Sequence, residues 1–344
     1  MAVADLLDLA YGIVEKWTSS QRLPPSLLKL PCYLLSNVSA LRPPHCDKME
    51  AAVNASFPTP VLYGDVLWGE WHLDKTVHFM DYTHLPIALA VTMFYVGMVY
   101  YGQRYMEDKP AWDLRHTLTA WNFGLSAFSG YSFFKLFPET FNSLMKGGMI
   151  GTLCYNGDLY KDEVYGYWIW LFAMSKGPEL IDTVFLILRK REIIFLHWYH
   201  HSLTYIGGSI FFSALVPWTR WIAILNLGVH TVMYFYFGTR SAGLHLPSTL
   251  SKMITTAQII QFACGFYFFF RLCWMYVSNE AADLPECHPK LDLLGLGMIV
   301  LGSYIYLFSK FFYNAYIKKD SKKRAREAKI KEVTAEKEAT KKDQ

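Results

Sequence analysis

The sequence carries little charge for its length. Asp, Glu, Lys and Arg make up 18% of its 344 residues, against roughly a quarter in an ordinary soluble protein. Hydrophobic residues make up 53% and aromatic residues 17%. This composition argues against a soluble enzyme. It predicts an all-α polytopic membrane protein, because a helix satisfies its own backbone hydrogen bonds in lipid.

Cysteine is also scarce, and its spacing excludes a zinc site. The six cysteines, at positions 32, 46, 154, 264, 273 and 287, contain no C-x-x-C pair. Nucleic-acid binding has little support, because no basic segment outside the apolar runs is interleaved with aromatic residues. The formal net charge of +4 hides an asymmetry, since residues 318–344 hold eleven Lys and Arg against six Asp and Glu. We interpret this segment as a solvated cytosolic tail.

Seven apolar stretches come near the length of about 20 residues that a spanning helix needs. They are Leu85–Gly102, Leu118–Phe137, Val164–Leu188, Ile193–Leu215, Trp218–Phe237, Met253–Val277 and Leu291–Ile317. Lys176, Gly177 and Pro178 interrupt the third stretch, which we expect to be kinked or broken there. The chain thus divides into three parts. They are a lumenal N-terminal region (1–80) with a short amphipathic helix and a Pro-rich segment, a seven-helix membrane domain (81–317) and a basic tail (318–344).

The basic residues of the loops predict the orientation in the membrane. They gather in alternate loops: Arg104, Lys109 and Arg115; Arg189, Lys190 and Arg191; Arg240 and Lys252; and the tail. Because base-rich loops stay in the cytosol, we predict a cytosolic C-terminus and a lumenal N-terminus. The ending Lys341-Lys342-Asp343-Gln344 then matches an endoplasmic reticulum retrieval signal on a cytosolic tail.

Two further features fall on the predicted lumenal side. Asn37 and Asn54 each begin an N-x-S sequon and are candidate glycosylation sites, although sequons also arise by chance. Cys154 and Cys287 lie in different lumenal loops, where an oxidising compartment permits a disulfide. Two free thiols are the alternative.

Four consecutive stretches carry polar residues at helical spacing, so that each set forms one face. These polar stripes are Lys176, Glu179, Asp182 and Thr183; His197, His200 and His201; Asn226, His230 and Tyr234; and Thr255, Gln258 and Gln261. An ionisable group near the bilayer centre costs about 2.5–3.5 kcal/mol. We therefore expect the stripes to face a common site between the helices, open to the cytosol. A purely structural polar core is the alternative.

Two chemistries suit the histidine triplet His197, His200 and His201: metal binding, and nucleophilic or acid–base work by imidazole. Membrane di-iron desaturases and hydroxylases use an H-x-x-H-H box, but they need several such boxes and this chain has one. An enzyme of that kind remains the alternative. A seven-helix receptor or transporter is the non-enzyme alternative, although the D/E-R-Y and N-P-x-x-Y receptor motifs are missing.

The stripes resemble the ordered motifs of the ELO family of very-long-chain fatty acid elongases. Lys176 to Thr183 fits K-x-x-E-x-x-D-T, Leu196 to His201 fits L-H-x-x-H-H, Asn226 to Phe237 fits N-x-x-V-H-x-x-M-Y-x-Y-Y, and Thr255 to Gln261 fits T-x-x-Q-x-x-Q. Phe237 stands where the motif has its last tyrosine. The sequence around the triplet is most similar to members that elongate saturated and monounsaturated chains.

This resemblance implies an acyltransferase, a 3-oxoacyl-CoA synthase of the endoplasmic reticulum. It would condense a long-chain acyl-CoA with malonyl-CoA to 3-ketoacyl-CoA, CoA and carbon dioxide. The implied fold has seven spans, six of them around a central acyl-CoA tunnel. The CoA thioesters are substrates, so no cofactor and no metal are expected. The implied partners are membrane lipid and the ketoacyl reductase, dehydratase and enoyl reductase of the elongation cycle. Self-association is a further possibility.

Within that reaction we assign His200 as the nucleophile that forms an acyl-imidazole. His197, His201 and His230 would move protons and hold His200 in a reactive tautomer. Substrate-binding and supporting roles fall to the remaining stripe residues: Lys176, Glu179, Asp182, Asn226, Tyr234, Gln258 and Gln261.

Overall fold

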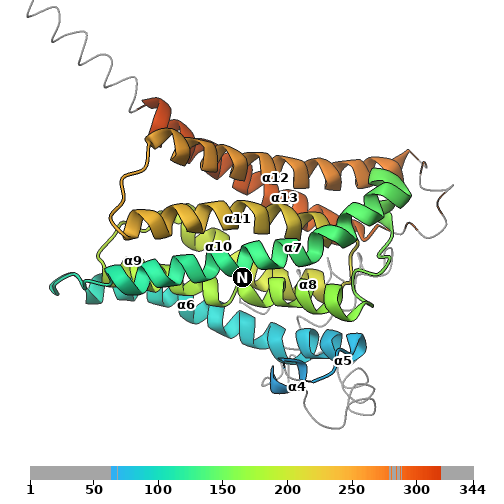
Figure 1. Cartoon of the computed structure of the whole chain (residues 1–344), viewed down its shortest axis with the longest axis horizontal. Coiled ribbons are helices and arrows are strands. Elements are labelled where there is room, and N and C mark those ends of the chain that lie inside the picture. Colours follow the sequence, from blue (N-terminus) through green and yellow to red (C-terminus); the bar gives the residue numbers. More distant parts are fainter. Residues whose placement is uncertain are drawn as a thin grey trace, which may run out of the picture.

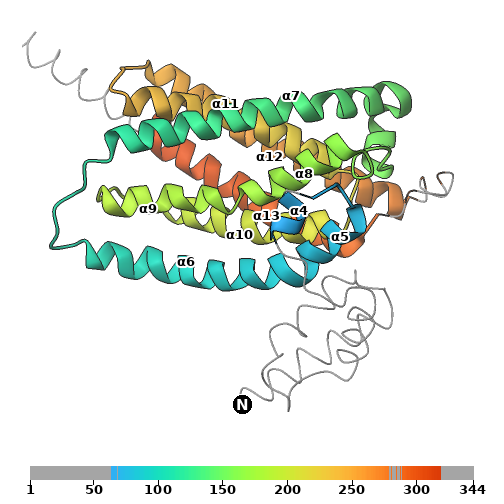
Figure 2. The same ribbon diagram turned by 60° about the horizontal axis from the view of Figure 1, so that its bottom comes forward.

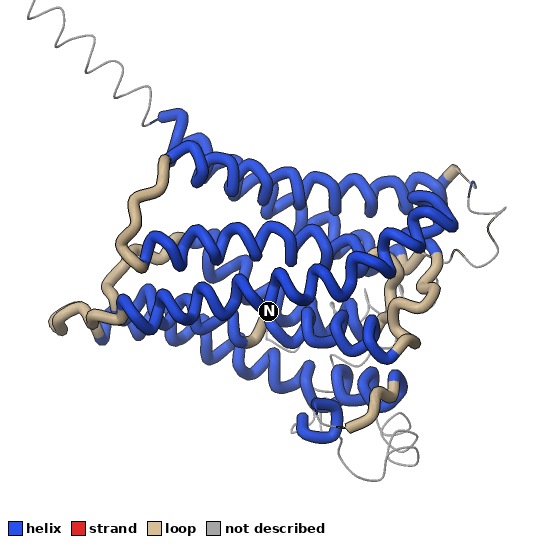
Figure 3. Tube along the Cα trace, viewed as in Figure 1, coloured by secondary structure: helices blue, strands red, loops and turns tan. Residues whose placement is uncertain are grey.

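The computed structural model describes residues 63–318, except for positions 68, 279, 281–283, 285, 286 and 288. Within these residues all the regular secondary structure is helical, and loops connect the helices; there is no strand in this part of the chain (Figures 1 and 3). The predicted N-terminal amphipathic helix, both sequons at Asn37 and Asn54, and the tail beyond Lys318 lie outside the described residues.

Each of the seven apolar stretches falls on one to three helical elements. The helices are α4 (Tyr63–Leu67), α5 (Leu73–His78), η2 (Phe79–His84), α6 (Leu85–Tyr105), α7 (Arg115–Cys154), α8 (Glu163–Ser175), η3 (Pro178–Leu180), α9 (Ile181–Leu188), α10 (Phe195–Ser213), α11 (Thr219–Ser241), α12 (Ser248–Val277), α13 (Leu291–Phe312) and η5 (Tyr313–Ile317). The all-helical expectation is therefore met in the described part of the chain.

Four of these segments are long and apolar enough to cross a membrane: Leu73–Tyr105, Thr219–Ser241, Ser248–Val277 and Leu291–Ile317. The remaining stretches differ from a plain apolar span in identifiable ways. Helix α7 contains Pro138 and bends at Gly148, where φ is 62°. The third stretch is split into short helices, and α10 carries the histidine triplet. A multi-pass membrane protein follows from the four segments, whereas the count of seven spans remains a prediction.

The predicted break in the third stretch is present. Helix α8 ends at Ser175, a single 3-10 turn spans Pro178–Leu180, and α9 begins at Ile181. Pro178 has no backbone N–H and its ring disfavours a helical conformation in the residue before it, which is consistent with the interruption of the helix at this point. The break lies within the Lys176–Thr183 motif. The polar side chains of this motif therefore extend from an interrupted helix and do not form one regular helical face.

The long helices pack in a closed circuit. Helix α7 packs on α11, α11 on α12, α12 on α13, α13 on α10, α10 on α8, and α8 on α7. Figure 2 shows α6 outside this circuit, along α10. Helices α7 and α11 run antiparallel, because Arg115 at the start of α7 donates to Ala242 after α11, and Glu139 farther along α7 pairs with Arg220 at the start of α11.

One end of the circuit is held by buried polar and covalent links. The structure joins Cys154 and Cys287, the pair considered from the sequence, in a disulfide. Close by, the buried guanidinium of Arg220 donates to the carbonyls of Tyr155 and Asn156 at 2.8 and 2.6 Å and lies 3.4 Å from the carboxylate of Glu139. These links tie the end of α7 and the following loop to α11 and to the segment before α13.

Candidate active site

A cavity of about 130 Å³ lies inside the helix circuit. Side chains from α8, α10, α11, α12 and α13 line it, and one of them comes from each of the four polar stripes. These four residues are Lys176, His200, Asn226 and Gln261. The expected convergence of the stripes on one site is therefore present, although a single member of each stripe reaches the cavity wall.

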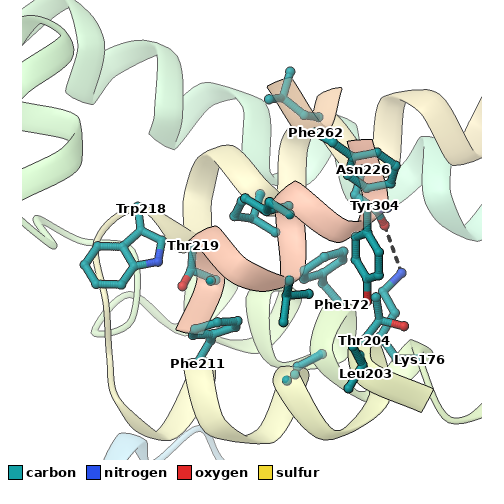
Figure 4. Close-up of a pocket in the computed structure, with 18 of the residues that line it drawn as sticks. Phe172, Lys176, Leu203, Thr204, Phe211, Trp218, Thr219, Asn226, Phe262 and Tyr304 are labelled. Atoms are coloured by element: carbon teal, nitrogen blue, oxygen red, sulfur yellow. Dashed lines mark hydrogen bonds between the residues drawn. The ribbon is translucent and has the colours of Figure 1, made fainter. Parts of the chain in front are cut away.

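The rest of the cavity wall is mostly apolar. In Figure 4, Lys176, Asn226 and Tyr304 lie toward one end, and Trp218 and Phe211 lie toward the other. A glycine keeps the wall compact, because a Cβ atom at Gly297 would collide with the ring of Phe269. The cavity thus has polar side chains toward one end and mostly apolar ones elsewhere, a lining of the kind that binds an apolar group carrying a polar head.

Lys176 is held firmly at the polar end. Its Nζ donates to Glu179 Oε1 at 2.6 Å and to Asn226 Oδ1 at 2.9 Å, the contact dashed in Figure 4, and lies 4.7 Å from the ring centroid of Phe172. All three polar side chains are buried. An ammonium group has three protons, so one donor remains for a further acceptor.

Glu179 connects this lysine to His230, a member of the third stripe. Its Oε1 lies 3.6 Å from His230 Nδ1, beyond a good hydrogen bond but within ion-pair distance. His230 is buried and its ring contacts Tyr234 at a centroid distance of 5.4 Å. Glu179 therefore neutralises Lys176 and lies beside a histidine of the neighbouring helix, which fits a supporting role for the carboxylate.

Asp182 of α9 takes its hydrogen-bond partners from two other helices. Its two carboxylate oxygens accept from Trp121 Nε1 at 2.7 Å and from Tyr234 OH at 2.8 Å. These bonds link α9 to α7 and α11. Tyr234 gives its hydroxyl proton to Asp182, so that proton is not available to stabilise an oxyanion in the cavity. The hydrogen bond between the two residues instead holds α9 to α11.

The three rings of the histidine triplet differ in their position relative to the cavity. The ring of His201 lies between those of His197 and His200, at centroid distances of 4.5 and 5.5 Å. Of the three, His200 is the one that lines the cavity, next to the rings of Tyr304 at 4.9 Å and Phe262 at 6.1 Å. His197 instead contacts Thr183 through Nε2 at 2.9 Å.

The fourth stripe, formed by Thr255, Gln258 and Gln261, divides in a similar way. Gln261 lines the cavity, whereas Gln258 points its amide at the sulfur of Met233, 3.2 Å away. Thr255 contacts the hydroxyl of Tyr316 at 3.3 Å. Four of the residues assigned from the sequence line the cavity. The other seven lie outside its wall: His197, His201, His230, Glu179, Asp182, Tyr234 and Gln258.

Several aromatic residues of the site were missed by sequence reasoning. They are Tyr95, Trp121, Phe172, Phe262 and Tyr304. Each lies in an apolar stretch where it reads as a lipid-facing or packing residue. Two of them have a periodic signal: Phe172 lies four residues before Lys176, and Tyr304 lies three residues after Leu301, another cavity residue. As for metal binding, the described residues hold no group of three or more His, Cys, Asp or Glu side chains arranged to bind an ion.

Comparison with known proteins finds a match to one family and several similar sequences. Residues 79–324 match the family described as the GNS1/SUR4 (ELO) family. Long chain fatty acid elongase 2 of Caenorhabditis elegans is 44% identical over 257 residues, covering 75% of this chain and 92% of that protein. Very long chain fatty acid elongase 3 of Homo sapiens is 32% identical over 272 residues, 78% of this chain and 96% of that protein. Very long chain fatty acid elongase 6 of Drosophila melanogaster is 34% identical over 227 residues, covering 65% and 70%.

Proposed function

The chain belongs to the GNS1/SUR4 (ELO) family, and on that premise we propose that this fatty acid elongase is the condensing enzyme of the elongation cycle. It joins a long-chain acyl-CoA to malonyl-CoA and releases 3-ketoacyl-CoA, CoA and carbon dioxide. One observation carries the proposal. Lys176, His200, Asn226 and Gln261, one residue from each polar stripe, meet on the wall of a cavity that is otherwise apolar.

The first half-reaction transfers the acyl group to the enzyme. A ring nitrogen of His200 attacks the thioester carbonyl, a C–N bond forms, and the C–S bond breaks to release the CoA thiolate. A thiolate is a good leaving group, because the pKa of such a thiol is about 8.5. His200 suits this role because its ring is accessible from the cavity, whereas His197, His201 and His230 lie behind the cavity wall.

The second half-reaction forms the new carbon–carbon bond. Malonyl-CoA loses carbon dioxide, and the electron pair of the broken bond becomes an enolate. The enolate carbon attacks the acyl carbon, and the C–N bond breaks. The ring of His200 regains from a neighbouring histidine the proton that it gave up on acylation, so that it returns as a neutral imidazole. Asn226 suits oxyanion stabilisation, because its Oδ1 is occupied by Lys176 and its Nδ2 donor is left for the cavity. The remaining proton of Lys176 suits a carboxylate or a phosphate.

The membrane arrangement belongs to the same proposal. The chain crosses the endoplasmic reticulum membrane seven times, with the N-terminus lumenal and the C-terminus cytosolic. Six spans surround the tunnel and α6 is the seventh, which is consistent with the packing circuit and with α6 outside it. CoA binds at the cytosolic end, and the product passes to the reductase, dehydratase and enoyl reductase. No cofactor takes part, since the CoA thioesters supply both carbon fragments.

Activity of the purified protein tests this function directly. With palmitoyl-CoA and malonyl-CoA together, we expect a 3-ketoacyl-CoA two carbons longer, with one CoA and one carbon dioxide for each condensation. With palmitoyl-CoA alone, mass spectrometry of the intact protein should show one acyl adduct and an equal amount of free CoA. Stoichiometric iron together with oxygen consumption, and no keto product, would support the di-iron alternative and refute the proposal.

The apolar end of the cavity is expected to set the chain length of the substrate. Trp218 and Phe269 close this end, with ring centroids 5.6 Å apart. Replacing Phe269 or Trp218 by Leu lengthens the space for the acyl chain. Each buried methylene contributes about 0.8 kcal/mol, so two more carbons should favour the longer acyl-CoA roughly tenfold in kcat/KM.

A product profile over a series of acyl-CoAs measures this shift. Phe268→Leu is the matched control, because Phe268 is a buried neighbour that packs on Trp221 and does not line the cavity. An unchanged profile in both Trp218→Leu and Phe269→Leu would mean that the alkyl chain does not occupy this end.

A further inference from the structure

A row of three hydrogen-bonding groups connects α6 to the histidine triplet. Tyr95 OH lies 2.7 Å from Thr183 Oγ1, which in turn lies 2.9 Å from His197 Nε2. Thr183 is fully buried and Tyr95 is 2% exposed. The row spans three helices, since Tyr95 belongs to α6, Thr183 to α9 and His197 to α10. Tyr95 belongs to none of the polar stripes, and α6 contributes no residue to the cavity wall.

The number of protons in this row determines which group donates in each of its two hydrogen bonds. Each hydroxyl has one proton to donate, and a neutral imidazole donates from one nitrogen and accepts at the other. If Tyr95 donates to Thr183 and Thr183 donates to His197 Nε2, both hydroxyl protons are used. In the opposite direction, His197 donates to Thr183 and Thr183 to Tyr95. The buried proton of Tyr95 then has no acceptor among the described residues.

Burying a donor without an acceptor is costly, because the group loses its water and gains nothing in return. The row therefore favours the first direction, in which His197 Nε2 is an acceptor. The ring proton of His197 then lies on Nδ1. A second proton on Nε2 would reverse both hydrogen bonds and leave the Tyr95 proton unpaired, so the row also favours the neutral ring.

We propose that Tyr95 is a positioning residue which, through Thr183, holds His197 in the neutral tautomer that carries its proton on Nδ1. This inference rests on the proposed condensation, in which His197 and His201 serve the nucleophile His200. The three rings are in series, with centroid distances of 4.5 and 5.5 Å. His201 Nδ1 is buried and has no hydrogen-bond partner among the described residues, so no hydrogen bond at this atom fixes the tautomer of that ring.

A packing role for Tyr95 is the competing explanation. Its ring lies in a buried apolar cluster with Ala88, Val99, Leu180 and Tyr205. Tyr95→Phe keeps the ring and removes the hydroxyl alone, so a packing role would leave the activity unchanged. Tyr205→Phe is the matched control. Tyr205 is buried in the same cluster, and no hydrogen bond of its hydroxyl is found among the described residues.

Steady-state kinetics of the full-length protein in detergent test the inference. We expect kcat to fall about tenfold in Tyr95→Phe and 10- to 100-fold in Thr183→Val, with the KM values of both CoA substrates unchanged, because proton handling alone is affected. The double variant should match Thr183→Val, since one row cannot be broken twice. Thr183→Ser keeps the hydroxyl and should retain the wild-type kcat, as should Tyr205→Phe.

Each result has a definite meaning. If wild type forms keto product and Tyr95→Phe keeps the wild-type kcat, or if the two losses are additive, the positioning role is wrong. If wild type forms no keto product, the proposed function fails instead. Thermal unfolding in detergent verifies that each variant is folded. Should Tyr95→Phe not fold, an equal loss of kcat in Thr183→Ser and Thr183→Val would still overturn the inference, because serine preserves the row.

Discussion

Replacing His200 by alanine is expected to lower kcat for 3-ketoacyl-CoA formation by more than about 1,000-fold and to abolish the acyl adduct. The reason is the loss of the attacking atom itself, which no neighbour replaces. His200 is the member of the histidine triplet that lines the cavity, and the rings of Tyr304 and Phe262 hold it there. Removing it creates a small space at the cavity wall and leaves no buried charge behind. We therefore expect the variant to fold.

The adduct separates this role from an effect on binding. Wild type incubated with palmitoyl-CoA alone should gain the mass of one acyl group, and His200→Ala should not. His245→Ala is the control, because His245 is an exposed histidine in the loop between α11 and α12. An acyl adduct of normal yield in His200→Ala would mean that another residue is the nucleophile. The free thiol of Cys264 in α12 would be the next side chain to replace.

Replacing Lys176 by methionine is expected to lower the free energy of unfolding by about 3–5 kcal/mol, and to abolish condensation. The side chains of Lys176 and Glu179 are only 6% and 4% exposed, and their charged atoms are 2.6 Å apart. Methionine is similar in size but carries no charge. The carboxylate of Glu179 would then be buried without its ammonium partner, with His230 as the remaining nearby cation when that ring is protonated.

The double variant tests whether unpaired charge is the cause. Lys176→Met combined with Glu179→Gln removes both charges. The unfolding midpoint of this double variant should therefore return most of the way from that of Lys176→Met to that of wild type, while condensation stays absent. Lys310→Met is the matched control, because Lys310 is exposed near the end of α13 and its Nζ lies 5.8 Å from the ring centroid of Tyr306. A wild-type unfolding midpoint for Lys176→Met would show that the pair contributes nothing to stability.

Much of the helical layout could be predicted from the chain. Long apolar runs, the proline at 178 and the polar stripes are local features, and each has a direct physical consequence in lipid or in a helix backbone. For that reason the seven apolar stretches coincide with helices, and the third is broken between Ser175 and Ile181. The prediction that the stripes meet also followed, since a polar face turned to lipid is costly.

The inner structure of the site could not be predicted in the same way. His197 and His200 are three residues apart and so differ by about 60° around the helix axis. Only the packing of α10 between α8 and α13 decides that His200 faces the cavity and His197 faces Thr183. The same holds for Asp182, whose partners come from α7 and α11 across many residues of sequence.

The sequence by itself thus determined the helices, the break and the set of polar residues that must be buried together. These depend on the spacing of side chains along one segment and on the cost of placing charge in an apolar medium. Tertiary structure alone decided which stripe member lines the cavity, that Asn226 and His230 of α11 lie beside Lys176 and Glu179, and that Tyr95 of α6 reaches His197 through Thr183. Those contacts join segments far apart in the chain. They depend on the rotation of each helix about its axis, which is set by the packing of all the helices at once.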